Sequence, residues 1–208
     1  MTQDNSTLIR SFLRFDSDDQ FYIVQVMRRK KDNPDAFKSI HIIKEFYIKS
    51  IEQYDRVLPD MIKYAEMFNA RVTIRLNRRS FKKTAHKMLK EIADKMESGQ
   101  YESLKNAFSS SAGKFHDEPN KTWILDFDKE DNEAGILMAD ILDHINNYCQ
   151  PDMNGNSKLV AYIPSATGSH LIVTPFNPNG SEKGRKSFRE LYPTIEIHKD
   201  NPTNIYIP

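Results

Sequence analysis

The segment TWILDFD, residues 122–128, sets two acidic side chains into an otherwise apolar run. A short run rich in aromatic and large aliphatic residues favours a β-strand, and this one is apolar enough for a central position in a sheet. Successive side chains of a strand point to opposite faces, so Asp126 and Asp128 project from the same face. The segment therefore predicts a sheet that carries a pair of carboxylates.

Two carboxylates on one face of a buried strand repel each other, and burial removes their hydration. A divalent cation relieves both penalties, and Mg²⁺ or Mn²⁺ suits carboxylate oxygens. The alternative is an ordinary strand end, because the charged residues DKEDNE follow at 128–133.

The rest of the chain alternates between strand and helix patterns, which indicates an α+β fold with mixed or antiparallel sheets and flanking helices. Pro59 predicts a break or a first-turn position in the helix around it. We expect strands at 20–29, 39–48, 71–76, 122–128, 158–164, 169–175, 194–197 and 204–207, and helices at 51–68, 80–96, 101–109, 137–148 and 186–191.

The segment SSSAGKFHDEPN, residues 109–120, has the composition of a linker. It divides the chain into an N-terminal α+β lobe (1–112) with a basic helix and a C-terminal α+β lobe (113–208), or joins the two in one fused domain. The single Cys149 excludes an internal disulfide and a cysteine-based zinc site. With no secretory signal and no membrane-length apolar run, we expect a cytoplasmic protein without membrane contact.

The total charge is nearly balanced, with 30 Lys and Arg against 29 Asp and Glu, but the charges are segregated. Residues 70–90 contain no acid. Ordinarily a lysine-rich helix is a solvated surface, and this is the alternative interpretation. The cations of this window are Arg71, Arg75, Arg78, Arg79, Lys82, Lys83, Lys87 and Lys90.

Within this window, Asn77-Arg78-Arg79-Ser80 reads as a turn before a helix whose N-cap is Ser80. Free backbone N–H groups and two guanidinium groups at a helix start favour phosphate. We therefore expect Arg78 and Arg79 to bind phosphate, and Arg71, Arg75, Lys82, Lys83 and Lys87 to follow a nucleic-acid backbone.

His170 begins an apolar strand directly after Gly168 and Ser169. A single histidine in this position is more often structural or simply exposed. The remaining histidines lack zinc-ligand spacing, and no nucleophile elbow, Walker loop or dinucleotide fingerprint is present.

The order of these motifs resembles the catalytic core of the archaeo-eukaryotic primase superfamily, which includes the primase–polymerases. Asp126 and Asp128 match its first motif, and Gly168-Ser169-His170 match its second. The whole chain also resembles small proteins of prophages and mobile elements that share a similar NRRS segment and a KDNPT-like ending.

The resemblance implies a divalent-metal site at Asp126 and Asp128, completed by a third acid. Glu196 stands at the end of the expected strand, with Asp200 as the competitor. It further implies that Ser169 and His170 hold the phosphates of a nucleoside triphosphate, and that nucleic acid and a helicase or replication protein acting in trans are partners.

Three functions are compatible with these residues. The first is a primase–polymerase-like nucleotidyltransferase that uses Mg²⁺ or Mn²⁺ and acts on nucleic acid. The second is a non-catalytic nucleic-acid-binding accessory protein with a degenerate primase-like fold. The third is a metal-dependent nuclease. Convergence of Asp126, Asp128, His170 and a third acid in one pocket is the observation on which an enzymatic function depends.

Overall fold

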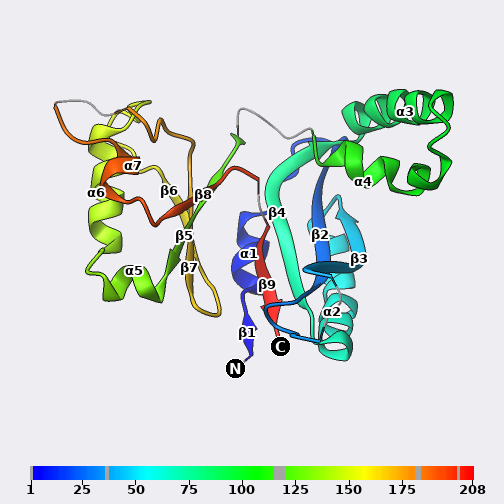
Figure 1. Cartoon of the computed structure of the whole chain (residues 1–208), viewed down its shortest axis with the longest axis horizontal. Helices are drawn as coiled ribbons and strands as arrows, with labels where there is room; N and C mark the ends of the chain where they lie inside the picture. The colour runs from blue at the N-terminus through cyan, green and yellow to red at the C-terminus, as the bar shows by residue number, and fades with distance from the viewer. Residues whose placement is uncertain (1, 36–37, 115–119, 181–183, 201) are drawn as a thin grey trace.

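The computed structural model describes residues 2–35, 38–114, 120–180, 184–200 and 202–208. Within them the protein is α+β, with seven α-helices and two sheets of five and four strands (Figure 1). The pairings between described strands are all antiparallel, so these sheets are antiparallel rather than mixed.

The first sheet combines strands from both ends of the chain. Its order is β1 (Gln3–Asp4), β9 (Thr203–Ile207), β4 (Arg71–Ser80), β2 (Gln20–Arg29) and β3 (Ile40–Ile48). The sequence analysis placed the final strand in the C-terminal lobe, but β9 pairs with β4 and β1, and all five of its residues are buried. The two lobes therefore share the end of the chain.

The second sheet carries the acidic motif on an interior strand. Its order is β6 (Leu159–Pro164), β7 (Gly168–Val173), β5 (Trp123–Asp128) and β8 (Glu196–His198). Because β5 has a neighbouring strand on each of its edges, it is central in this sheet, as its apolar sequence predicts.

The helices follow the amphipathic patterns closely. The break predicted at Pro59 is wrong, because Pro59 lies inside the continuous helix α2 (Ile51–Phe68), whose Tyr54, Met61 and Ala65 are buried. The burial of that face outweighs the one hydrogen bond that proline removes. The helices are α1 (Ser6–Phe12), α2 (Ile51–Phe68), α3 (Phe81–Glu97), α4 (Ala107–Ala112), α5 (Lys129–Glu133), α6 (Met138–Tyr148) and α7 (Phe188–Leu191), with a 3₁₀ turn at Tyr101–Asn106.

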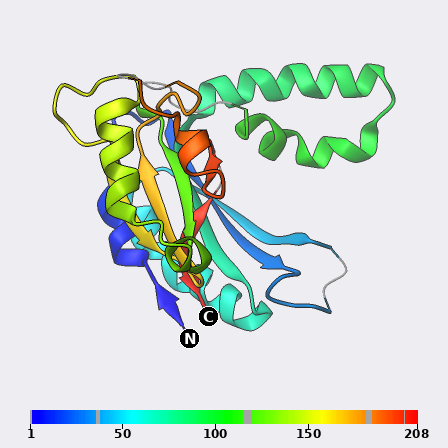
Figure 2. The ribbon, with the colours of Figure 1, turned by 60° about the vertical axis from the view of Figure 1, so that its left-hand side comes forward.

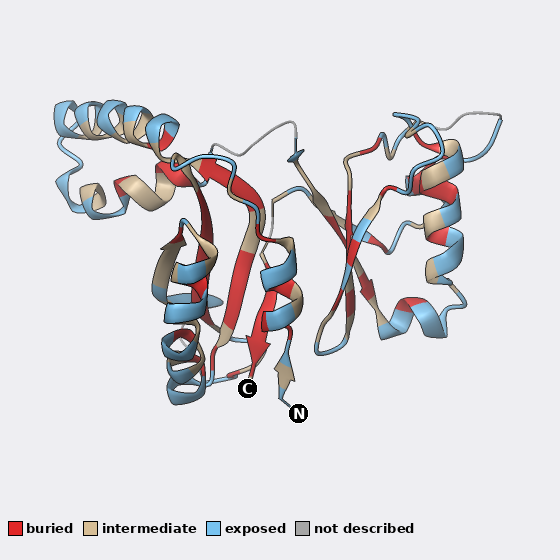
Figure 3. Ribbon diagram, turned by 180° about the vertical axis from the view of Figure 1, so that it is seen from behind, coloured by how far each residue is buried: buried red, intermediate tan, exposed pale blue. Residues whose placement is uncertain are grey.

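One hydrophobic core joins the two sheets. Ile124, Ile163 and Ile172 of the second sheet pack in the same cluster as Ile205 of β9 and Ile9 of α1. A second cluster lies on the other face of the second sheet, beneath α6 and α7. Burial is accordingly concentrated along the strands of both sheets (Figure 3).

The helix pair α3 and α4 projects from the body, to the same side as the β2–β3 hairpin (Figure 2). Ser80 caps α3 as predicted, because its hydroxyl accepts a hydrogen bond from the Lys83 N–H at 3.1 Å. The expected linker begins later than predicted, since α4 continues to Ala112, and residues 115–119 of that linker lie outside the described residues. No described helix combines the length and apolarity needed to cross a membrane.

The segment 77–80 is not a turn, because its residues complete β4 and pair with β2 up to Ser80. Its side chains join the two sheets. The Asn77 amide donates to the carbonyls of Thr122 at 3.0 Å and Lys199 at 3.2 Å. These two residues stand where the chain enters and leaves the second sheet. Asn77 of β4 therefore binds both segments that connect the two sheets.

Asp200 provides the charge at this joint. Its carboxylate accepts hydrogen bonds from Arg79 at 2.6 Å and from Arg75 at 3.3 Å, and the Arg79 side chain is completely buried. A buried guanidinium that loses its carboxylate is left with an uncompensated charge. The ion pair therefore ties β4 to the segment between β8 and β9.

We expect Asp200→Asn to lower the free energy of unfolding by about 3 kcal/mol, the usual cost of removing one partner of a buried ion pair. Urea denaturation monitored by circular dichroism measures this change. Asp18→Asn is the matched control, since Asp18 is exposed and its substitution is expected to stay within about 0.5 kcal/mol. Equal unfolding midpoints for the two variants would contradict the assigned role of Asp200.

Candidate functional site

A single row of side chains crosses three strands of the second sheet. Asp126 on β5 stands directly opposite His170 on β7 and directly opposite Glu196 on β8. Residues opposite each other in neighbouring strands share a face of the sheet. The fold therefore places the first motif, the second motif and one candidate third acid side by side.

Asp128 lies on the same face, two residues beyond Asp126. The Thr167 hydroxyl donates to its carboxylate at 2.9 Å, from the turn between β6 and β7. This turn can approach closely because residue 168 is glycine: a Cβ there would stand 2.7 Å from the Asp128 Cα. The small residue two positions before His170 is thus required by the contact between β7 and β5.

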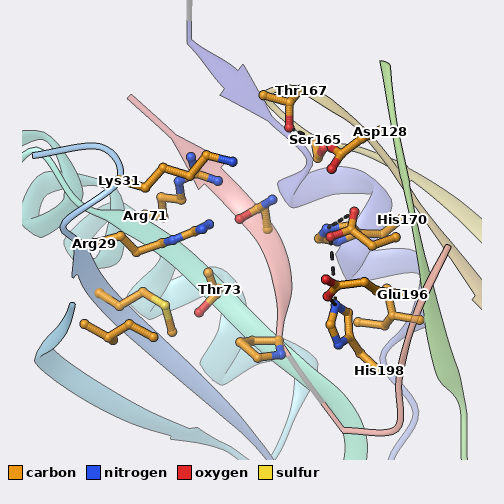
Figure 4. A pocket seen from close by; sticks show the side chains of 16 residues that line it. Arg29, Lys31, Arg71, Thr73, Asp128, Ser165, Thr167, His170, Glu196 and His198 are labelled. Carbon is orange, nitrogen blue, oxygen red and sulfur yellow. Dashed lines mark hydrogen bonds and ion pairs between the residues drawn. The ribbon is translucent and has the colours of Figure 1, made fainter. Parts of the chain in front are cut away.

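These side chains line one wall of a cleft of about 350 Å³ between the two sheets. The opposite wall carries Arg29 and Arg71 of the first sheet and Lys31 from the turn after β2 (Figure 4). Thr73 of β4 lies between the two walls, below the arginines. A volume of this order is typical of sites that bind small molecules. The cleft thus opposes carboxylates to cations.

The ionised form of Asp126 is disfavoured at the acidic wall. Burial raises the pKa of Asp126 above its ordinary value, and the nearby charge of Asp128 raises it further. Nearby positive charge, such as a bound cation, would favour the ionised form of Asp126. This is the condition expected of carboxylates that share a metal ion.

His170 is held as a neutral imidazole. Burial lowers its pKa to about 4, and the neighbouring His198 contributes to the shift. Its Nδ1 atom is 2.7 Å from the hydroxyl of Thr203, whereas its Nε2 atom lies 3.6 Å from Asp126 Oδ1, too far for a hydrogen bond. Thr203 therefore fixes the ring, and Nε2 faces the acidic row.

His198 is a site residue that the sequence analysis missed. Its Nε2 atom lies 3.2 Å from Glu196 Oε2 and 3.9 Å from Asp126 Oδ2. The sequence contained a signal for His198, because a residue two positions after Glu196 on a strand lies on the same face of the sheet. The basic end of the strand at residues 28–31 (RRKK) likewise could have indicated Arg29 and Lys31.

The donor chemistry of the row fits a hard divalent cation. Asp126, Asp128 and Glu196 supply carboxylate oxygens on one face of the sheet, the ligands that Mg²⁺ and Mn²⁺ prefer. Among the described residues, however, no three His, Cys, Asp or Glu side chains stand in an arrangement that could hold a metal ion. Binding by all three acids therefore requires their side chains to turn toward one another.

Asp200, the competing third acid, does not line the cleft, because Arg75, Arg79 and Asn77 hold its carboxylate at the joint. The same hydrogen bonds hold the Arg75 and Arg79 side chains at the joint, outside the cleft. Arg78 pairs with Asp16 at 2.6 Å and also stands outside the cleft. The expected phosphate site at Arg78 and Arg79 is therefore not assembled with Asp126 and His170.

Of the remaining predicted residues, some line the cleft and others lie outside it. Arg71 lines the cleft and donates to Asp32 at 2.7 Å. Ser169 is buried and points away from the row, since it is adjacent to His170 on β7. Lys82, Lys83 and Lys87 lie on the projecting α3, outside the cleft lining, and their contact with nucleic acid stays a prediction.

Comparisons of this chain with models of protein families, with curated proteins and with solved structures find no match. The resemblance to the primase superfamily therefore stays a prediction from the sequence motifs.

We expect Gly168→Ala to lower the free energy of unfolding by about 1–3 kcal/mol, the usual cost of forcing extra atoms into a packed contact. The added methyl group would push β7 away from the Asp128 backbone. Urea denaturation provides the measurement. Gly113→Ala is the control, because a Cβ there meets its nearest atoms at an ordinary 3.6 Å, and no loss beyond about 0.5 kcal/mol is expected. An equally stable Gly168→Ala protein would show that this contact adjusts freely.

We expect NMR titration of the metal-free protein to show His170 neutral until the pH approaches 4. In the unfolded chain a histidine takes up its proton near pH 6.5. Between these values the unfolded state binds more protons, so the stability conferred by the neutral imidazole is lost as the pH falls. Urea unfolding at pH 7 and pH 5 should show a smaller drop for His170→Asn than for the wild type. A His170 titration near 6.5 would contradict this assignment.

Proposed function

We propose that this protein is a metal-dependent nucleotidyltransferase of the primase–polymerase type that acts on nucleic acid. The observation that supports this function is the convergence of Asp126, Asp128, His170 and Glu196 in one cleft. Motifs about 40 and 70 residues apart in the sequence meet there, as a catalytic function requires.

The carboxylates of Asp126, Asp128 and Glu196 would hold the divalent cation. Mg²⁺ or Mn²⁺ held there would supply positive charge to the reacting oxygens of a phosphoryl transfer. The protein's contribution is to keep two of these acids on one interior strand, so that their spacing is fixed by the backbone.

His170 would position a phosphate group. In the tautomer in which Nδ1 accepts a hydrogen bond from the Thr203 hydroxyl, the neutral imidazole carries its one proton on Nε2, toward the cleft. That N–H can donate a hydrogen bond to a phosphate oxygen. Thr203 lies on β9 of the first sheet, so the orientation of His170 depends on both sheets.

The basic wall would bind the rest of the polyanion. Arg29, Lys31 and Arg71 stand across the cleft from the acids, where a polyphosphate lying between the walls can contact both (Figure 4). Arg71 is oriented by its ion pair with Asp32, which favours a fixed contact with a phosphate. These residues take the role that the sequence analysis gave to Arg78 and Arg79.

Extension of a labelled primer on a template with Mn²⁺ and nucleoside triphosphates tests the proposal. We expect Asp126→Asn/Asp128→Asn to lower the rate at least 100-fold, because even residues that merely support metal ligands cost about 10–100-fold. Glu130→Gln/Glu133→Gln is the matched control, since it removes two exposed charges from the adjacent α5 and should retain activity.

The products separate the alternatives. A longer labelled strand supports nucleotidyl transfer, whereas a shortened strand indicates the metal-dependent nuclease. Binding without any turnover indicates the accessory protein, which the lack of a preassembled three-ligand site in the described residues favours. Extension that survives the double substitution at Asp126 and Asp128 would reject the proposed function.

A further inference from the structure

Two exposed isoleucines lie on the cleft face of the first sheet. Ile40 is 53% exposed and Ile42 is 43% exposed, and both belong to β3, an edge strand. Ile42 stands opposite Met27 and Ile40 opposite Arg29. Exposed apolar residues on an edge strand favour unwanted strand pairing, and proteins usually replace them with charges. Two neighbouring isoleucines in this position therefore indicate a contact surface.

Cations border the apolar strip formed by Ile40 and Ile42. Arg29 lies directly beside Ile40, and Arg71 stands opposite Met27 on β4. Met27, Ile40 and Lys31 line the same cleft as the catalytic acids. Within the described part of the chain, neither Arg29 nor Lys31 forms an ion pair. An apolar surface next to such cations matches one nucleotide unit, whose base is apolar on its faces and whose phosphate is anionic.

We propose that a base of single-stranded nucleic acid packs on Ile40 and Ile42 while its backbone phosphates contact Arg29 and Lys31. This inference rests on the proposed function, in that it places a strand in the same cleft. A double helix keeps its base faces inside the stack, so only an unpaired base can reach the strip. Apolar side chains such as Ile and Met pack against bases elsewhere in nucleic-acid recognition.

The position of the strip favours a strand over a free nucleotide. It lies at the outer edge of the sheet, where a polymer can continue past β3 rather than end inside the cleft. Exposed Lys30 and Lys38 lie on the same hairpin, beyond the strip, and provide further charge for a continuing backbone. A free nucleotide has no phosphates to reach them.

The test uses a short single-stranded oligonucleotide that carries one 2-aminopurine, whose fluorescence reports how its base is packed. Affinity is measured at several salt concentrations for the wild type and for Ile40→Thr/Ile42→Thr. Threonine is also β-branched and keeps the strand preference of the edge. Val160→Thr is the matched control, because Val160 is 46% exposed on β6, an edge strand of the other sheet. Thermal unfolding verifies that each variant is folded.

We expect Ile40→Thr/Ile42→Thr to weaken binding about tenfold, near the lower end of the loss that follows removal of one base–aromatic contact. The dependence of affinity on salt should not change, since that dependence counts phosphate contacts. Lys31→Gln should do the opposite, weakening binding while lowering the salt slope by about 0.7, the value for one phosphate on a single strand. Val160→Thr should bind as the wild type does.

The inference is overturned if Ile40→Thr/Ile42→Thr binds the strand as tightly as Val160→Thr. It is also overturned if the double variant weakens only a mononucleotide such as dATP, or if the wild type does not bind the strand. Primer extension is measured separately with the same proteins. Isoleucine-dependent strand binding without extension supports this surface and rejects the proposed polymerase activity, so the two failures are distinguishable.

Discussion

The contact between the Asp200 carboxylate and the buried Arg79 guanidinium, at 2.6 Å, is the interaction on which the arrangement of the two sheets depends. The chain enters the second sheet at Thr122 and leaves it through Lys199 and Asp200, and Asn77 binds both passages. Because all of these contacts converge on β4, one strand sets the position of the acidic wall relative to the basic wall. A cleft between two sheets needs such a fixed joint, since neither wall alone encloses a ligand.

Residues whose role follows from strand periodicity could be predicted from the sequence. The common face of Asp126 and Asp128, the strand that contains His170 and the apolar face of α2 depend on neighbours a few positions away. The continuity of α2 through Pro59 was not predicted, because it depends on burial against the rest of the fold. Roles that depend on register could not be derived in this way. Glu196 faces Asp126 because β8 pairs with β5 in one register, and a shift of one residue would turn it to the opposite face.

The basic residues of the 70–90 segment also show what the sequence could and could not predict. Eight cations without a local acid indicated a binding surface, but Arg75, Arg78 and Arg79 have acidic partners that are distant in the sequence, Asp200 and Asp16. Charge patterns along a chain report only partners within a few residues. Arg29 at the basic end of β2, and Lys31 just after it, reach the cleft because β2 runs beside β4 in the fold. The near-zero total charge therefore hides a site where both signs meet.

The three carboxylates of the acidic wall differ in how firmly they are held, and this difference bears on the proposed metal site. Asp126 is fixed on an interior strand and is 30% exposed, whereas the Glu196 side chain is 72% exposed on the short edge strand β8. Ordering a long, exposed side chain around an ion costs conformational entropy that an already buried one does not lose. The first two acids thus form the stable part of the site, and Glu196 must gain enough from a bound ion to offset that cost. In the proposed nucleotidyl transfer, recruitment of Glu196 to the metal site depends on this balance.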